Sequence, residues 1–183
     1  MNLPNKLTCV RMAMIPFFVI FMMVPIPGLD YMVCRYIALA IFIIASLTDM
    51  LDGKIARKYN LVTDFGKFMD PLADKLLVCT AMICLIDSGD LPAWVVIIII
   101  AREFIISGFR LVASDNGIVI AASWWGKIKT VTQMVMIIFL MLKLPGQPAY
   151  IIGQILIYAA MILTVISLCD YLMKNKGVLA NQK

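Results

Sequence analysis

Residues 49–74 read DMLDGKIARKYNLVTDFGKFMDPLAD, a stretch that begins where one apolar run, Tyr31 to Thr48, ends and that finishes inside another, Phe65 to Ile86. Five of the eleven acidic residues of the chain fall in this stretch. A carboxylate beside hydrocarbon costs about 2.5–3.5 kcal/mol even on a mild insertion scale. So many acids at one place therefore need a compensating partner.

Two stripes of carboxylates and small residues are expected on the helices that flank the turn. If the helix of the first run continues to Arg57, its rotation of about 100° per residue brings positions three and four apart onto one face. The first stripe consists of Asp49, Asp52, Gly53 and Ala56, and the second of Gly66, Asp70 and Asp74. A short turn would bring the stripes together, and the small residues leave room for a helix or a ligand. For Asp64, just before Phe65, a helix-capping role is favoured.

Converging carboxylates repel one another unless a cation binds between them. The chain has no histidine, and its five cysteines form no CxxC pair, which argues against a zinc site or a disulfide framework. Hard divalent ions prefer oxygen ligands. We therefore expect two divalent cations, Mg²⁺ or Mn²⁺, at Asp49, Asp52, Asp70 and Asp74; the alternative, helix caps and loop charges at the membrane surface, explains their shared helical phase less well.

The composition excludes a water-soluble globule, because 63% of the 183 residues are hydrophobic and only 15% are charged. At about 20 residues per span, the chain has room for about six membrane helices. The six apolar runs are Met12–Val24, Tyr31–Thr48, Phe65–Ile86, Leu91–Val112, Val131–Leu144 and Tyr150–Met173. We predict an all-α polytopic integral membrane protein, a single domain over residues 1–183 with six transmembrane helices and a short interfacial segment at residues 2–8.

The basic residues predict the topology. With alternating spans, only Arg35 and Lys143 fall on one side of the membrane, and the other lysines and arginines fall on the opposite side. The positive-inside rule then places both termini and the acidic stretch at the cytoplasmic face of the cell membrane. The net charge of +5 fits anionic lipid headgroups better than nucleic acid. Trp94, Trp124 and Trp125 fall near span ends and are expected at the membrane interface.

The acidic stretch resembles a known family. At every fixed position it matches DxxDGxxARx8GxxxDxxxD, the pattern of the CDP-alcohol phosphotransferases, with eight fixed residues over 26 positions. Residues 2–11, 101–110 and 126–134 resemble the branch of that family that uses sn-glycerol 3-phosphate as acceptor. The resemblance covers essentially the whole chain.

The resemblance implies transfer of a phosphatidyl group from CDP-diacylglycerol to glycerol 3-phosphate, with release of CMP, by a homodimeric enzyme. It makes Asp49, Asp52, Asp70 and Asp74 the metal ligands and Asp74 the general base, although the residues alone leave Asp70 open as the base. It assigns the CDP-binding role to Asp52, Gly53, Ala56, Arg57 and Gly66. The alternative for Arg57 is a snorkelling charge that sets topology.

An acceptor that carries a phosphate needs cations in its site. The candidates are Arg110 and Lys129 first, Arg102 next, and Lys127 last, because Lys127 points away from the helix face shared by Gly126, Lys129, Thr130 and Gln133. Glu103 shares a face with Ser107 and Arg110, so we expect it to orient Arg110 by an ion pair. The alternative is that these cations only set topology.

Two other functions stay open. One is an enzyme of the same family with serine, inositol phosphate or phosphatidylglycerol as acceptor. The other is a small divalent-cation transporter, in which intramembrane aspartates bind the carried ion. Against transport, the acids crowd one end of two consecutive helices and mark no path through the midplane.

Overall fold

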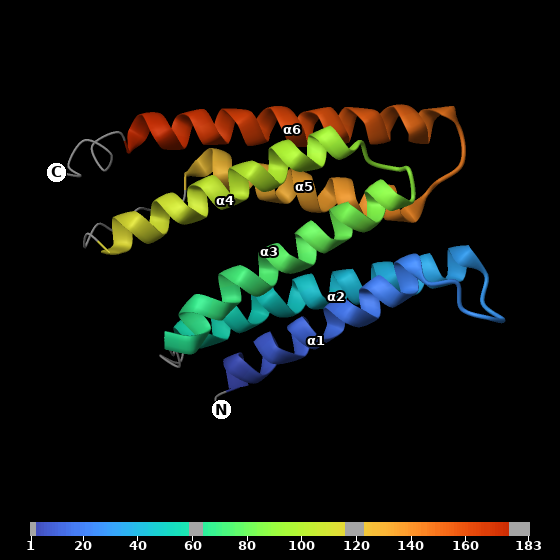
Figure 1. Ribbon diagram of the computed structural model, residues 1–183, viewed down its shortest axis with the longest axis horizontal. Coiled ribbons are helices and arrows are strands. Elements are labelled where there is room, and N and C mark those ends of the chain that lie inside the picture. The colour runs from blue at the N-terminus through green and yellow to red at the C-terminus, as the bar shows by residue number, and fades with distance from the viewer. Residues whose placement is uncertain (1–2, 59–63, 116–122, 176–183) are drawn as a thin grey trace. The chain divides into compact units, whose positions relative to one another are not determined.

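In the part of the chain that is described, all the regular secondary structure is helical. The computed structural model describes the backbone of residues 3–58, 64–115 and 123–175, and the side chains of residues 7–48, 72–113 and 123–175. Over these residues it contains α1 (Leu3–Met23), α2 (Tyr31–Lys58), α3 (Asp64–Asp87), α4 (Ala93–Asp115), α5 (Trp124–Leu142) and α6 (Gln147–Lys174), and no strand (Figure 1). The predicted all-α class is confirmed.

Each predicted apolar run corresponds to one helix, with shifted ends. α2 continues to Lys58, as the predicted aspartate stripe requires. The segment expected at the interface is helical from Leu3 onward and forms the first two turns of α1, and its position at the membrane interface stays a prediction. α5 begins at Trp124, close to the more polar start near Ala122 that the sequence predicts for this run. The connections turn at Gly28 and Gly89, whose φ angles of 86° and 74° are rarely adopted by residues with a Cβ.

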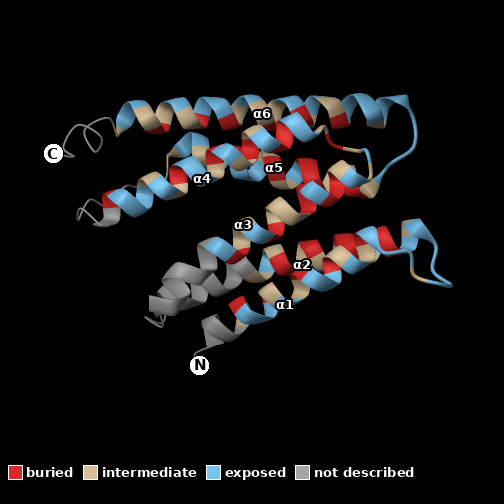
Figure 2. Cartoon of the chain, viewed as in Figure 1, coloured by how far each residue is buried: buried red, intermediate tan, exposed pale blue. Residues whose placement is uncertain are grey.

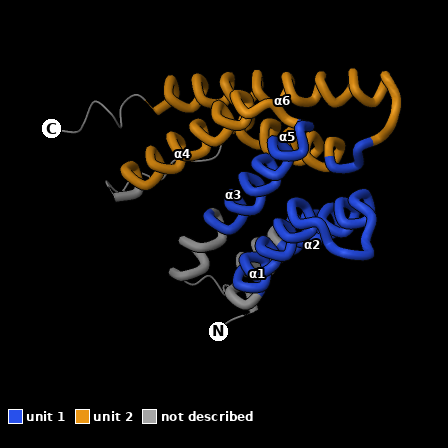
Figure 3. The backbone as a smooth tube through the Cα atoms, turned by 45° about the vertical axis from the view of Figure 1, so that its right-hand side comes forward, with its two compact units in different colours: residues 1–90, 141–143 blue, residues 91–140, 144–183 orange. Residues whose placement is uncertain are grey.

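The chain divides into two compact units (Figure 3). Unit 1 comprises residues 1–90 and 141–143, and unit 2 comprises residues 91–140 and 144–183. The prediction of a single domain over residues 1–183 stays a prediction.

The core of unit 1 follows helical spacing. Buried side chains recur every three or four residues on α1 at Ile15, Phe18 and Met22, and α2 contributes Phe42, whose ring centroid lies 6.2 Å from that of Phe18. α3 contributes Leu77 among others. This periodicity lets each helix bury one stripe against the other two.

The outside of the helices is apolar as well. On α4 the large side chains of Ile97, Phe104 and Leu111 are exposed at seven-residue spacing, opposite the buried stripe (Figure 2). In water so much exposed apolar surface would be unfavourable, whereas lipid is a suitable solvent for it. Among the described residues, α2, α5 and α6 are long and apolar enough to cross a membrane. The chain is thus an all-α membrane protein, and the count of six spans stays a prediction.

The five cysteines form no disulfide with one another. Because they lie mostly within apolar runs, the sequence predicts that they are small buried residues. This prediction is confirmed for Cys34 and Cys84, and it is wrong for Cys9 and Cys169, which are exposed on the outward faces of α1 and α6.

In unit 1, Asp90 pairs with two cations. Arg35, with a side chain only 1% exposed, donates from Nη2 to Asp90 Oδ2 at 2.6 Å and from Nε to the carbonyl oxygen of Met141 at 2.9 Å. Lys143 Nζ lies 3.6 Å from Asp90 Oδ1. These are the two cations that the topology prediction left on the sparsely charged side. Asp90 balances one of their two charges, so they oppose the predicted orientation less than a simple count suggests.

We predict that Asp90→Asn destabilises the protein, because it leaves the buried Arg35 guanidinium without its carboxylate partner. Loss of one partner of a buried pair costs about 3 kcal/mol or more, or a fall in Tm of roughly 6 °C or more. Thermal unfolding of the purified protein in detergent measures this shift. Lys143→Ala is the matched control, since this side chain is 42% exposed and its pair should contribute little. Equal Tm values for both variants would contradict this account.

Candidate active site

The four aspartates lie at the same end of unit 1. Asp49 and Asp52 are in the last turns of α2, and Asp70 and Asp74 are in the first half of α3. The end of α2 and the start of α3 lie close together in the ribbon (Figure 1). The backbone is therefore compatible with the predicted convergence of the two stripes.

The side-chain detail of that convergence lies mostly outside the described residues. This applies to Asp49, Asp52, Gly53, Ala56, Arg57, Asp64, Gly66 and Asp70. Asp74 is described and is half-buried, next to the fully buried Ala73. Among the described residues there is no group of three or more acidic or cysteine side chains that could hold a metal ion. The predicted metal set is thus untested, since three of its four members fall outside the described side chains.

The same end of unit 1 also buries a cation. Arg11 and Thr8, both on the first half of α1, are buried. α1 begins at the end of the unit where α2 finishes (Figure 1). A buried arginine is costly unless anionic groups lie near it. Carboxylate oxygens are the ligands that hard divalent cations prefer, and a buried guanidinium is suited to bind a phosphate.

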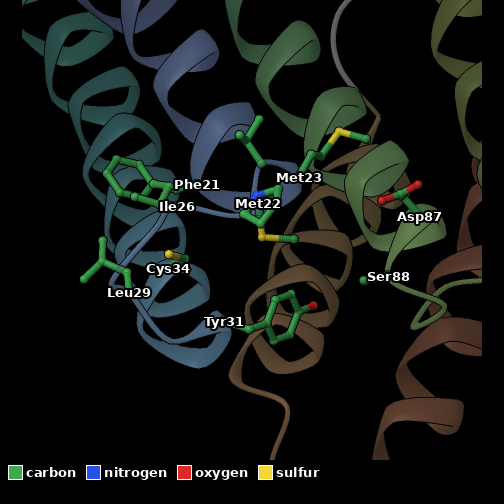
Figure 4. A pocket seen from close by; sticks show the side chains of 11 residues that line it. Phe21, Met22, Met23, Ile26, Leu29, Tyr31, Cys34, Asp87 and Ser88 are labelled. Carbon is green, nitrogen blue, oxygen red and sulfur yellow. The ribbon is translucent and has the colours of Figure 1, made fainter.

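A pocket lined by described residues of unit 1 lies at the other end of these helices. It has a volume of about 410 Å³ and is lined by Met22, Tyr31, Cys34 and Ser88 among others (Figure 4). Tyr31 and Asp49 are separated by 18 residues of α2, or about 27 Å of helix. This pocket is therefore not the place where the aspartates gather.

In unit 2 the buried stripe changes from apolar to polar along the helices. At one end it is made of side chains such as Val95 and Ile99 on α4, Met136 and Ile137 on α5, and Ile157 on α6. Toward the other end polar residues join the buried stripe, beside Ile106 and Ala113 on α4 and Tyr171 on α6; they are Arg102 on α4, Lys129 and Gln133 on α5, and Thr164 and Ser167 on α6. Sequence reasoning did not single out Thr164 and Ser167. The steps of four, three and four residues from Ala160 through Thr164 and Ser167 to Tyr171, on an apolar helix, are the signal that could have identified them.

Glu103 links the buried cations of this polar cluster. Its Oε1 accepts a hydrogen bond from Arg102 Nη1 at 3.0 Å and another from Lys129 Nζ. Arg102 also donates from Nη2 to Ser167 Oγ at 2.5 Å. The side chains are about 10% exposed for Arg102, 17% for Glu103 and 2% for Lys129. Two buried cations thus share one carboxylate, which leaves a net charge of about +1.

The expected ion pair between Glu103 and Arg110 is wrong. Arg110 is exposed, and its guanidinium lies 5.7 Å from the ring centroid of Tyr171. Arg110 lies seven residues beyond Glu103, or about 10.5 Å along the helix, whereas Lys129 approaches Glu103 from α5. The structure therefore brings Arg102 and Lys129 together and leaves Arg110 outside this pair.

Lys127 and the tryptophans lie on the surface, as expected from the helical phase. Lys127 Nζ is 5.9 Å from the ring centroid of Trp124, and both residues are exposed. Trp125 is exposed beside them, and Trp94, at the start of α4, is half-exposed. Of the predicted shared face of α5, Lys129 and Gln133 are buried, whereas Thr130 is exposed and donates to the carbonyl oxygen of Gly126 at 2.9 Å.

The polar cluster of unit 2 has spare hydrogen-bonding capacity. Among the described residues, buried atoms without a hydrogen-bond partner include Arg102 Nε and the hydroxyl oxygen of Tyr171. Buried polar groups in native proteins are usually satisfied. Two unsatisfied donors in a region with net positive charge are suited to an anionic ligand with several acceptor oxygens, such as a phosphate.

The fold and these clusters define an all-α membrane protein with a buried cationic cluster suited to phosphate. The chain belongs to the CDP-alcohol phosphatidyltransferase family, whose family model matches residues 1–166. That match extends over residues of both units. Enzymes of this family are generally dependent on divalent metal ions.

Several relatives are similar over nearly their whole length. A protein of Bacillus subtilis strain 168 is 46% identical over 183 residues, covering 95% of each chain. One of Haemophilus influenzae is 40% identical over 183 residues, covering 97% of this chain and 95% of the relative. One of Rickettsia bellii is 38% identical over 173 residues, covering 93% of each. All three are named CDP-diacylglycerol–glycerol-3-phosphate 3-phosphatidyltransferase.

Proposed function

We propose that the protein transfers the phosphatidyl group of CDP-diacylglycerol to sn-glycerol 3-phosphate, giving phosphatidylglycerophosphate and CMP. The observation that carries this proposal is the family membership, together with relatives that share this name over nearly the whole chain. In the reaction, the acceptor hydroxyl oxygen forms a bond to the β-phosphorus. The bond from that phosphorus to the oxygen bridging to the α-phosphate breaks, and CMP leaves with this oxygen.

The acidic end of unit 1 is the proposed nucleotide and metal site. Asp49, Asp52, Asp70 and Asp74 would hold two divalent cations, Mg²⁺ or Mn²⁺. Such ions neutralise charge on a pyrophosphate and on its leaving group. The proposed CDP site consists of Asp52, Gly53, Ala56, Arg57 and Gly66. Gly53 and Ala56 leave room for the nucleotide along α2, and the Arg57 guanidinium is suited to bind a phosphate.

A carboxylate takes the proton of the acceptor hydroxyl in this proposal. With no histidine in the chain, Asp74 is the first candidate for this base and Asp70 the second. The half-buried position of Asp74 is compatible with a base that exchanges its proton with water.

The polar cluster of unit 2 is the proposed site for the phosphate of the acceptor. Lys129 and Arg102 are its main cations, because both are buried and both are held by hydrogen bonds. Arg110, held over the Tyr171 ring, is a further candidate at the more exposed edge of α4, and Lys127 stays last. An anionic acceptor suits this cluster better than zwitterionic serine. The names of the relatives favour glycerol 3-phosphate over inositol phosphate or phosphatidylglycerol.

The membrane arrangement in the proposal follows the charge pattern. The proposal puts both termini, the acidic end of unit 1 and the polar cluster of unit 2 at the cytoplasmic face of the cell membrane. Water-soluble glycerol 3-phosphate is available at this face. A homodimer is expected for this family and is part of the proposal. Transport of a divalent cation, the alternative from another class, has no specific observation in its favour.

The direct test is release of CMP from CDP-diacylglycerol by the purified full-length protein in detergent. We expect release that requires both glycerol 3-phosphate and Mg²⁺ or Mn²⁺, and that stops on chelation and resumes when the metal is restored. Release with serine or inositol phosphate in place of glycerol 3-phosphate would reassign the acceptor. Absence of release with every acceptor, combined with flux of divalent cations into proteoliposomes, would overturn the proposal.

Asp52→Asn should reduce turnover by about 10³-fold or more, because it removes a metal ligand without adding bulk. CMP release at saturating substrates measures the loss. The Tm and the detergent-solubilised yield should stay close to those of the wild type. Asp87→Asn, the same chemical change at an exposed residue at the end of α3, is the control and should keep full activity. Near-normal turnover of Asp52→Asn would refute the metal assignment.

Lys129→Ala should chiefly raise the KM for glycerol 3-phosphate, by about 10-fold or more, because a charge-assisted bond to the phosphate is lost. The KM for CDP-diacylglycerol should change little. Initial rates with each substrate varied in turn separate the two effects. Lys127→Ala, which removes an exposed cation two residues away, is the matched control. An unchanged KM for glycerol 3-phosphate would indicate that Lys129 only sets the topology.

A further inference from the structure

Glu103 has an unusual place among the acidic residues of the described chain, because one of its oxygens serves two buried cations on two helices. Arg102 is its neighbour on α4, and Lys129 comes from α5. Consecutive helical residues point about 100° apart, so Arg102 and Glu103 do not face each other by helical phase alone. The side chains bend toward a common point, and Lys129 meets them there.

The arrangement around this point restrains the guanidinium of Arg102 on two sides. Nη1 donates to Glu103, and Nη2 donates to Ser167 on α6. Nε is buried without a hydrogen-bond partner. Lys129 is almost fully buried and is hydrogen-bonded to the same glutamate oxygen as Arg102. A guanidinium and an ammonium that would otherwise repel each other are therefore held at a defined separation by one carboxylate.

We propose that Glu103 is a positioning residue for the acceptor substrate. It holds the Arg102 guanidinium and the Lys129 ammonium at the spacing that binds the phosphate of glycerol 3-phosphate. This inference rests on the proposed function and deepens it. Glu103 does not itself touch the acceptor, since a carboxylate would repel the phosphate; it acts through the two cations.

Two roles of a carboxylate in such a cluster predict opposite effects. If Glu103 only balanced charge, its neutralisation would make the cluster more positive, and any anion would bind more tightly. If Glu103 positions the cations, its neutralisation lets them separate, and the phosphate loses its matched pair of donors. The sign of the change in KM therefore distinguishes positioning from charge balance.

The experiment compares Glu103→Gln and Glu103→Asp with the wild type in the full-length purified enzyme. For Glu103→Gln we expect the KM for glycerol 3-phosphate to rise by about tenfold, with kcat within about threefold and the KM for CDP-diacylglycerol unchanged. Glu103→Asp keeps the charge but is one methylene shorter, so it cannot reach both cations as well and should also raise this KM. Asp87→Asn, the same change from acid to amide at an exposed position, should leave every constant unchanged.

A second measurement does not depend on turnover. Glycerol 3-phosphate should raise the Tm of the wild-type protein, and this rise should be much smaller for both Glu103 variants at the same concentration. If Glu103→Gln does not fold, the Glu103→Asp variant provides the result, because it keeps the negative charge of the cluster. An unchanged or lower KM in either variant, or a full Tm shift, would overturn the positioning role. A wild type that releases no CMP but still shows the shift would count against the proposed reaction and not against Glu103.

Discussion

The main constraint on this molecule is that a charge among apolar helices needs a partner. Each compact unit meets this constraint in the same way, with one carboxylate that pairs with two cations: Asp90 with Arg35 and Lys143 in unit 1, and Glu103 with Arg102 and Lys129 in unit 2. A lone buried ion would be driven to its neutral form or out of the core. Pairing lets the chain keep cations at fixed places in a largely apolar environment.

The Asp90 cluster and the Glu103 cluster have different roles. The Asp90 cluster joins the start of α2, the connection after α3 and residues 141–143, and its polar groups bind mainly one another. In the Glu103 cluster the donor Arg102 Nε is buried and has no hydrogen-bond partner among the described residues. The first arrangement is suited to hold helices together, whereas the second keeps capacity for an anion. The two clusters contain similar types of residue, and they differ in whether a buried donor has no hydrogen-bond partner.

Helical periodicity made much of this predictable. The six apolar runs correspond to the six described helices, because an apolar stretch of this length in lipid must satisfy its backbone hydrogen bonds internally. The continuation of α2 to Lys58 and the burial of Lys129 and Gln133, with Lys127 turned outward, follow from the spacing of residues on one helix. Helical periodicity also made the aspartate pattern of residues 49–74 recognisable, and this pattern agrees with the family to which the chain belongs.

Periodicity assigns a residue to a helix face. It does not say which neighbouring helix covers that face, or at which position along the helix axis the two helices meet. Glu103 and Arg110 share a face, yet they are two turns apart, and Lys129 from α5 supplies the nearer partner. In the same way, Arg35 and Lys143 are far apart in sequence and meet only because Asp90 lies between them. The amino-acid sequence alone thus specified the helices, their polar faces and the family. The pairing of charges arose only from tertiary packing, because an ion pair depends on distances between helices that no single helix contains.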